Sequence, residues 1–498
     1  MSLSKKCIII GSGFAGMSAA AFMARAGWDV TVIEKNDQPG GRARQWKQDG
    51  FTFDMGPSWY WMPDVFERFF QQFGKKVSDY YTLERLDPSY RVYWSEEEER
   101  WRDGGMDIPA GLPALKELFE SIEIGAGAKL EQFMEEAAFK YRVGMQKLVH
   151  KPGQSLTEFI DLDIVKGVFK LDVFTNMKAH VQKFFKDPKL RQLMEFPVLF
   201  LGAMPEDTPA LYSLMNYADV VGGTWYPKGG MYSIVDAMYK LAKEQGAKFK
   251  FNETVTAIEL HASTARSVST DHGRYDADVV IGGADYHHIE SALLPETHRS
   301  YSEQYWDSRV MAPSCLLYYV GLNKKLEGIH HHSLFFDTSL HQHAREIYAH
   351  PQWPSAPLFY MSATSVSDST VAPEGCENLF LLVPVAAGLN GDTEEVREKY
   401  FDLIIGRLEK HLGQSVRDAI ILKRSFAQSD FVRDYNSFKG NAYGLANTLK
   451  QTAILKPGCR SKKVNNLFFT GQLTVPGPGV PPSLISGELV AKEVIKNF

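Results

Sequence analysis

The first part of the chain alternates regularly between apolar runs and short polar breaks. Lys6–Ile10 ends in four consecutive apolar residues, which predicts a buried strand of a parallel sheet. An alanine-rich stretch that reaches about Arg25 predicts a helix, with Gly27 just after its end, and residues 29–34 alternate as a second strand. Together these elements predict a βαβ unit whose first turn is the glycine-rich segment 11–16.

The rest of the chain changes pattern several times, as expected when one domain is threaded through another. Residues 50–58 predict a strand and a turn, and residues 90–103 predict a hairpin whose tip is a run of four Glu. Residues 110–201 carry few Gly and many long side chains, which predicts helices. Later elements are predicted as strands at 314–322, 379–385 and 467–470, and as helices at 396–412 and 483–496.

The composition is that of a large folded protein. Its 498 residues, 44% of them hydrophobic, suffice for two or three domains or one interleaved α/β body. The 55 Lys and Arg nearly balance the 60 Asp and Glu, which argues against nucleic acid as a partner. No later apolar run approaches the roughly 20 residues of a membrane span. Isolated cysteines argue against disulfides or a cysteine zinc site and indicate a reducing compartment: Cys7, Cys315, Cys376 and Cys459.

The glycine spacing in segment 11–16 fits a dinucleotide-binding loop. Gly11 permits the tight turn, Gly13 lets the backbone approach a diphosphate, and Gly16 lets the helix pack closely on the strand. The helix N-terminus presents free N–H groups to the phosphates. Glu34, at the end of the second strand, is placed to accept hydrogen bonds from the ribose. The alternative is a glycine-rich turn in an ordinary βαβ unit.

A second glycine pair follows shortly after Glu34. Gly40 and Gly41 permit backbone contact with a ligand, and Arg42 supplies a guanidinium for phosphate. FAD and NAD share the first loop, and this second segment favours FAD, because a nicotinamide-binding fold usually continues into another helix here. The alternative is a surface turn with a solvated Arg42.

Three N-terminal segments together carry a family resemblance. GSGFAGMSAA (11–20), VIEKNDQPGGRA (32–43) and GFTFDMGPS (50–58) are similar to the opening of the flavin-dependent amine oxidase and phytoene desaturase superfamily, whose members bind FAD. This resemblance favours FAD as the cofactor.

Later segments extend the resemblance over the whole chain. Residues 223–231 resemble the segment by which carotenoid desaturases return to the FAD region, and residues 277–285 resemble a later Rossmann strand. Residues 466–480 resemble the bacterial phytoene dehydrogenase signature. They depart from that signature at Gln472, Leu473, Val475 and Pro478.

The resemblance implies an α/β fold in which a Rossmann-like FAD-binding domain with a parallel sheet is interleaved with a mixed-sheet substrate domain and a helical, membrane-facing lid. It places the FAD-binding domain at 1–105, 225–290 and 431–498, the lid at 106–224, and the substrate domain at 291–430. Spacing and resemblance together predict FAD contacts at Gly11, Gly13, Phe14, Ala15, Gly16, Glu34, Lys35, Gly41, Arg42, Gly56, Pro57, Ser58, Gly471, Gln472 and Val480.

The C-terminal motif has physical consequences of its own. Prolines at 476, 478, 481 and 482 delay regular structure until about Ser483, which would cap the following helix. That helix would direct its positive end at the pyrimidine edge of the flavin. The resemblance implies that Gly471 and Gln472 lie near the ribityl chain and Val480 near the isoalloxazine ring. The alternative is a proline-rich loop that caps a sheet.

Lysines and phenylalanines gather between residues 166 and 191. They predict either a membrane-surface element that admits a lipophilic substrate or an amphipathic helix that faces the core. Residues 196–204 and the aromatic segment 59–61 either line a tunnel or pack in the core. The helical repeat of the basic stretch consists of Val173, Met177, Val181 and Phe184.

Several histidines cluster late in the chain without any metal-binding pattern, and no metal site is predicted. Solvated loop positions are favoured for them. His287 and His288, which follow the later Rossmann strand, are placed where they could approach the cofactor. The cluster consists of His330, His331, His332, His341, His343 and His350.

The resemblance implies FAD-dependent desaturation in carotenoid biosynthesis. An allylic hydride would leave a linear C40, phytoene-type polyene for the flavin, and an adjacent proton would follow. Quinone or oxygen is the expected electron acceptor, and the expected location is peripheral, on the cytoplasmic face of the cell membrane. The sequence assigns neither a catalytic acid or base nor an oligomeric state.

Three alternatives stay open from the sequence. The first is a desaturase of a later, hydroxylated or monocyclic carotenoid. The second is a carotenoid isomerase, a saturase or an amine oxidase on the same scaffold. The third is a non-catalytic prenyl carrier that resembles GDP-dissociation inhibitors, which bind isoprenoids without flavin. Gly40–Arg42 and the C-terminal glycine-rich loop argue against a carrier, because neither is needed where no flavin is held.

Overall fold

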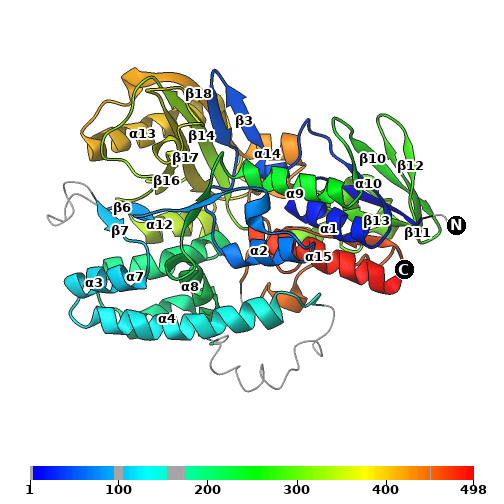
Figure 1. The fold of residues 1–498 in the computed structure, drawn as a ribbon, viewed down its shortest axis with the longest axis horizontal. Coiled ribbons are helices and arrows are strands. Elements are labelled where there is room, and N and C mark those ends of the chain that lie inside the picture. The colour runs from blue at the N-terminus through cyan, green and yellow to red at the C-terminus, as the bar shows by residue number, and fades with distance from the viewer. Residues whose placement is uncertain (1–3, 95–104, 154–171, 173–174, 449) are drawn as a thin grey trace.

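The parallel sheet of the predicted βαβ unit is assembled from both ends and the middle of the chain, and the two termini lie at the same end of the molecule (Figure 1). The computed structural model describes residues 4–94, 105–153, 172, 175–448 and 450–498. The sheet has the strand order β19-β13-β1-β2-β9, and all of its neighbours run parallel. Its strands are β1 (Lys6–Ile10), β2 (Asp29–Ile33), β9 (Lys248–Lys250), β13 (Val279–Gly282) and β19 (Leu467–Phe469).

Helix α1 (Phe14–Arg25) packs between α9 (Tyr232–Glu244) and α15 (Val480–Asn497). The contact with α15 joins the two ends of the chain, because Ser18 Oγ donates a hydrogen bond to the Leu484 carbonyl oxygen at 2.8 Å. The apolar run that predicted β1 and the alanine-rich run that predicted α1 thus form the buried centre of this half.

Helix α15 corrects one expectation. It begins at Val480 and not at Ser483, with Pro481 and Pro482 in its first turn. Proline is tolerated there because the first N–H groups of a helix have no partner within the helix. The prolines therefore start the helix instead of delaying it.

The second half of the molecule is built on a seven-stranded sheet with the order β18-β14-β17-β16-β15-β6-β7. Neighbouring strands are antiparallel except for the parallel pair β6 and β15. Helix α13 (Glu394–Leu412) contributes Ile404, Ile405 and Leu408 to the core on one face of this sheet. Its strands are β6 (Tyr90–Trp94), β7 (Met106–Ile108), β14 (Ser314–Leu322), β15 (His332–Phe336), β16 (Phe359–Ser362), β17 (Glu377–Val385) and β18 (Ile420–Phe426).

The predicted hairpin after residue 90 is present with a different return strand. Strand β6 pairs with β7, which comes after the residues 100–103 that were predicted to form the second strand of the hairpin. The expected return strand at 100–103 and the Glu tip lie outside the described residues. Because β6 also pairs with β15, residues 90–94 belong to the sheet of the second half, although the predicted boundary at 105 assigned them to the cofactor domain.

A layer of helices occupies the side of the molecule opposite β3 and β18 in Figure 1. In the part of the chain that the structure describes, no helix is both long and apolar enough to cross a bilayer. Much of the basic stretch, including Val173, lies outside the described residues; within α6, Met177 and Val181 are buried. The layer consists of α3 (Leu112–Ile122), α4 (Ala126–Val143), α6 (Met177–Phe184), α7 (Pro188–Glu195) and α8 (Leu214–Val220).

Smaller elements complete the fold. Strands β3 and β4, β5 and β8, and β10 to β12 form three small antiparallel sheets. The strands are β3 (Gln45–Gln48), β4 (Phe51–Asp54), β5 (Leu83–Arg85), β8 (Trp225–Pro227), β10 (Val255–His261), β11 (Thr264–Thr270) and β12 (Arg274–Asp276). The remaining α-helices of the described residues are α2 (Pro63–Gln71), α10 (Tyr286–Leu293), α11 (Glu303–Asp307), α12 (Leu340–Ala344) and α14 (Gln428–Tyr435).

Candidate active site

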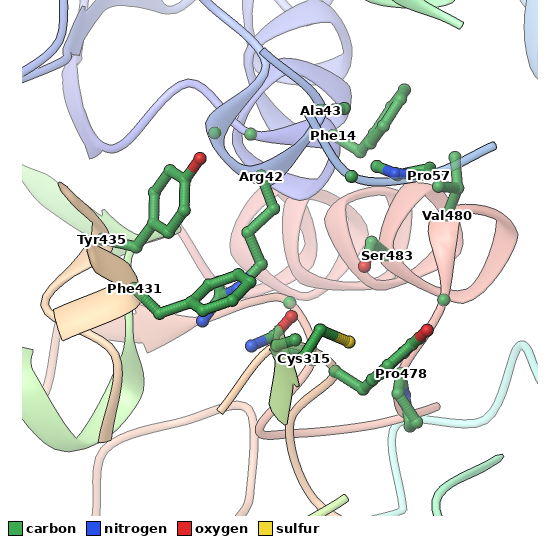
Figure 2. A pocket seen from close by; sticks show the side chains of 18 of the residues that line it. Phe14, Arg42, Ala43, Pro57, Cys315, Phe431, Tyr435, Pro478, Val480 and Ser483 are labelled. Carbon is green, nitrogen blue, oxygen red and sulfur yellow. The ribbon is translucent and has the colours of Figure 1, made fainter. Parts of the chain in front are cut away.

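One cavity of about 470 Å³ begins at the carboxyl ends of β1 and β2 and extends to the seven-stranded sheet. The carboxyl edge of a parallel sheet is where open α/β folds bind their ligands. Figure 2 shows the part of the wall where the N-terminal turn of α15, Arg42 and the C-terminal loop converge. Every predicted FAD contact except Gly16 lines this cavity: Gly11, Gly13, Phe14, Ala15, Glu34, Lys35, Gly41, Arg42, Gly56, Pro57, Ser58, Gly471, Gln472 and Val480.

The glycines of the first loop have separate tasks. Gly11 has φ +95°, a left-handed conformation that suits glycine. A Cβ on Gly16 would lie 2.1 Å from the Gly11 carbonyl oxygen, so Gly16 serves the close contact of helix and strand. A Cβ on Gly13 would meet no atom within 4 Å. Because Gly13 lines the cavity, its missing side chain leaves an open cradle of the kind a diphosphate requires.

Glu34 is held at the cavity by its own chain. Its Oε2 accepts hydrogen bonds from the Ser12 N–H and Oγ, both at 2.9 Å. Its Oε1 accepts from the Asn36 N–H at 2.9 Å and from Asn36 Nδ2 at 2.8 Å. These four donors fix the carboxylate at the cavity wall, and because a carboxylate has about four lone-pair directions, a ribose hydroxyl would bind Glu34 by replacing or sharing one of these hydrogen bonds.

Arg42 is part of the cavity wall. The alternative interpretation of residues 40–42 as a surface turn with a solvated Arg42 is therefore wrong. Its Nη2 donates to Ser437 Oγ at 2.8 Å and to the Asn441 carbonyl oxygen at 3.2 Å. With the Gln472 amide turned so that its oxygen faces the guanidinium, that oxygen accepts from Arg42 Nη2 at 2.9 Å. Burial lowers the pKa of Arg42, and Asp285 opposes this effect. The predicted second loop and the C-terminal loop therefore meet at one cation.

The C-terminal loop ends in the N-terminal turn of α15. Gly479 precedes the helix with φ +110°, and the wall includes Val480, Pro481, Pro482 and Ser483. The positive end of α15, an 18-residue helix, therefore faces the cavity. The open cradle at Gly13, the fixed carboxylate of Glu34 and this helix end fit an FAD molecule, which supplies a hydride acceptor when it is bound.

The far part of the cavity is lined mainly by apolar and aromatic side chains from the seven-stranded sheet and the helical layer. Of the aromatic segment, Trp59 and Trp61 line the cavity, whereas Tyr60 is fully buried and shares a hydrogen bond with the Tyr81 hydroxyl at 2.9 Å. Phe196 also lines the wall. A few polar groups interrupt this surface: Cys315, His343, Tyr348, Tyr360 and Tyr443.

The expectation of solvated histidines is wrong for three of the cluster. His331, His332 and His343 are at most 4% exposed. The reason is tertiary: β15, which begins at His332, is paired on both sides by β6 and β16. After the Rossmann strand, His288 lines the cavity, while His287 bonds Glu303 at 2.8 Å.

Sequence reasoning missed the wall that α14 contributes at the cofactor end. Tyr435 lies with its ring centroid 5.4 Å from the Arg42 guanidinium, and Asp434 Oδ2 bonds Arg44 Nη2 at 2.7 Å. Phe431 and Asn436 line the cavity beside them. No local signal marks these residues, because α14 has the pattern of an ordinary amphipathic helix.

A buried lysine was also missed. Lys456 is 5% exposed, and its Nζ has no hydrogen-bond partner among the described residues. Burial lowers its pKa from 10.5 to about 7. The unfolded chain keeps this proton up to its ordinary pKa, and the folded protein releases it above about 7. The free energy of unfolding therefore rises between these two pH values.

Replacing Lys456 with Met is expected to raise the free energy of unfolding by roughly 2–4 kcal/mol at neutral pH. The gain shrinks as the pH approaches 10.5, where the lysine is neutral in both states. Urea unfolding of the apoprotein at about pH 7 and about pH 10 measures the difference. If Lys456→Met were less stable than the wild type near neutral pH, the lysine could not be buried without a partner as the structure has it.

Comparison with known proteins agrees with this geometry. The sequence profile described as flavin containing amine oxidoreductase matches residues 14–495, so the chain belongs to this family. It is 41% identical over 492 residues to a carotenoid 3,4-desaturase of Haloarcula japonica, covering 98% of each chain. It is 31% identical over 497 residues to a zeta-carotene-forming phytoene desaturase of Myxococcus xanthus, covering 99% of this chain and 94% of the relative.

A solved structure of an oxidoreductase from Methanosarcina mazei superposes with a TM-score of 0.64 at 16% identity, over 98% of this chain and all (100%) of the other, which supports the fold alone. The protein is an FAD-dependent oxidoreductase, and its resemblance to carotenoid desaturases is confirmed. A flavin-free prenyl carrier does not fit this assignment.

Proposed function

We propose that the protein desaturates a linear carotenoid by removing an allylic hydride and an adjacent proton. The observation that supports this most is the continuity of the cavity, which joins the glycine cradle to an apolar compartment without a break. An elongated hydrocarbon would bind there by burial of its apolar surface. The full-length similarity to carotenoid desaturases supports the same reaction class.

The side chains at the junction suit a reaction through a positively charged hydrocarbon. Trp59 and Trp61 line the cavity, and the faces of aromatic rings attract cations. The neighbouring double bonds of the polyene delocalise the charge, so hydride loss needs no strong base beside the reacting carbon. Bound FAD supplies the hydride acceptor. Quinone or oxygen is proposed to reoxidise it.

A phytoene-type C40 polyene is the first proposed substrate. A later, hydroxylated carotenoid is the second, and a specific observation favours it. Three phenols and one thiol, besides His343, interrupt the mainly apolar surface of the compartment: Tyr348, Tyr360, Tyr443 and Cys315. Polar groups in a hydrophobic pocket fix the orientation of a ligand that carries a matching group. A terminal hydroxyl is such a group.

The experiment offers both substrates to the holoenzyme in liposomes of anionic phospholipid. A desaturated product absorbs at longer wavelength and has lost two hydrogens by mass, whereas an isomer keeps the mass of its substrate. Faster conversion of a hydroxylated acyclic carotenoid than of phytoene would select the second candidate. Sedimentation of the same liposomes tests the proposed peripheral binding to a membrane surface. The absence of desaturated product from both substrates would overturn the proposal.

A further inference from the structure

A tyrosine, a histidine and a tryptophan lie together in the wall of the apolar compartment. Tyr360 lines the cavity, and its hydroxyl lies 2.6 Å from His332 Nδ1. His332 does not line the cavity and is completely buried, at 0% exposure. The ring of Trp59 stacks on the imidazole with centroids 4.3 Å apart and an interplanar angle of 8°. Within the described part of the chain, the phenol is therefore the hydrogen-bond partner that links the imidazole to the cavity.

The backbone holds this arrangement in place. Tyr360 pairs with Leu334, and His332 pairs with Ser362, in the antiparallel register of β15 and β16. The Ser58 side chain lies beside the Tyr360 hydroxyl. Because Ser58 follows Gly56 and Pro57 at the edge of the predicted cofactor site, the phenol stands at the border between the cofactor end and the apolar compartment.

We propose that Tyr360 and His332 form the proton acceptor of the desaturation, with Trp59 stabilising the imidazolium; this inference rests on the proposed function. In the resting protein, His332 carries its proton on Nε2 and accepts a hydrogen bond from Tyr360 at Nδ1. Burial lowers the pKa of His332, which keeps the ring neutral in the resting protein and makes it a weaker base. The relay relies on the strong acidity of the C–H bond beside an allylic cation, which a weak base can deprotonate.

The step balances as a relay. After hydride loss the substrate is an allylic cation. The C–H bond next to the cationic carbon breaks, and its electron pair forms the new C=C bond. The proton goes to the Tyr360 oxygen as the phenolic proton moves to His332 Nδ1. The phenol is regenerated, and the positive charge ends on the imidazolium. The stacked face of Trp59 favours that charge. The proton returns to the cavity along the same path once the product has left.

The other imidazole of this compartment and the carboxylates of the cavity are engaged or placed elsewhere. His343 Nδ1 accepts from the Leu358 N–H at 3.0 Å, and its Nε2 lies 2.9 Å from the Pro384 carbonyl oxygen, so both nitrogens are used. The carboxylates that line the cavity within the described chain stand at its cofactor end: Glu34, Glu253, Asp285 and Asp434. Among the described imidazoles and carboxylates, the Tyr360–His332 pair is therefore the acceptor best placed in the apolar compartment.

The test compares Tyr360→Phe, His332→Gln and the double variant, with His331→Gln as matched control. His331 is also buried but bonds Ser367 Oγ at 3.0 Å and does not line the cavity. In single turnovers without oxygen, each single variant is expected to form product about 100-fold more slowly or worse, with no further loss in the double variant. Product formation by the wild type is expected to be slower in D₂O, and Tyr360→Phe is expected to lose this isotope effect. His331→Gln is expected to behave as the wild type.

A second measurement needs no turnover. In the apoprotein labelled with ¹⁵N-histidine, His332 is expected to show the Nε2–H tautomer, and Tyr360→Phe is expected to shift its Nδ1 resonance. An Nδ1–H tautomer, or an unchanged resonance in Tyr360→Phe, would overturn the relay. If Tyr360→Phe formed product at the wild-type rate, the relay would be refuted but the proposed function would stand. A wild type that desaturates no carotenoid would overturn the proposed function and the relay with it.

Discussion

Replacing Gly13 with Val is expected to abolish FAD binding while the apoprotein stays folded. The side chain would enter the open cradle, where a Cβ meets no protein atom within 4 Å, and would occupy the space of the diphosphate. Gly13 has φ −69°, which any residue adopts, so the fold itself tolerates the change at a cost of about 1 kcal/mol for a poorer N-cap. We expect FAD affinity to fall at least about 100-fold, or ~3 kcal/mol. Flavin absorbance after purification and FAD titration measure it.

The control for this prediction is Gly16→Ala, three residues away. Here a smaller side chain would lie 2.1 Å from the Gly11 carbonyl oxygen, and the helix must shift away from β1. This variant is expected to lose several kcal/mol of stability, roughly 3, and to bind FAD poorly for that reason. Normal flavin content in Gly13→Val, with a wild-type unfolding midpoint, would refute the cradle.

Replacing Gly487 with Val is expected to give the largest loss of stability outside the cavity. Its Cβ would lie 2.2 Å from the Ala15 carbonyl oxygen and 2.7 Å from Ser18 Cβ, so α15 would be pushed off α1. Overpacking of this kind lowers the free energy of unfolding by about 3 kcal/mol or more, because the contact is with backbone atoms, which cannot move aside as a flexible side chain can. Both helices carry cavity residues in their first turns, so FAD affinity is expected to fall as well. Urea unfolding of apoprotein and holoprotein measures both effects.

Gly273→Ala is the matched control for Gly487. A Cβ on Gly273 meets nothing within 4 Å, and this glycine does not have a positive φ. The control is expected to unfold within about 0.5 kcal/mol of the wild type. If Gly487→Val were equally stable, the close contact between the two ends of the chain would not be required for the fold.

Local pattern was sufficient for many of the elements that form the site. Lys6–Ile10 and Ser314–Leu322 match their predicted bounds, because continuous apolar runs between turn residues mark buried strands without reference to the rest of the fold. The glycine loop could also be predicted from the sequence, since the geometry of the turn and the close approach of its backbone to a ligand depend on residues only a few positions apart. The same holds for Glu34, whose place at the end of a strand follows from the length of the βαβ unit.

The features that the sequence did not predict depend on contacts between residues far apart in the chain. The pairing of β6 with β15 joins residues far apart in sequence, so residues 90–94 were assigned to the other half. Burial of His332 follows from the strands on either side of β15 and not from its neighbours in the chain. Gly487 carries no sequence signal, because its role appears only where α15 crosses α1.

The amino-acid sequence alone thus determined that this protein binds FAD and predicted its site between the two glycine-rich ends, because the loops that approach a phosphate encode their geometry in short spacings. Only the tertiary structure decided which side chains face the apolar compartment. The juxtaposition of Trp59, His332 and Tyr360 arises from a strand register and a stack between distant segments, and such contacts leave no period or spacing in the chain.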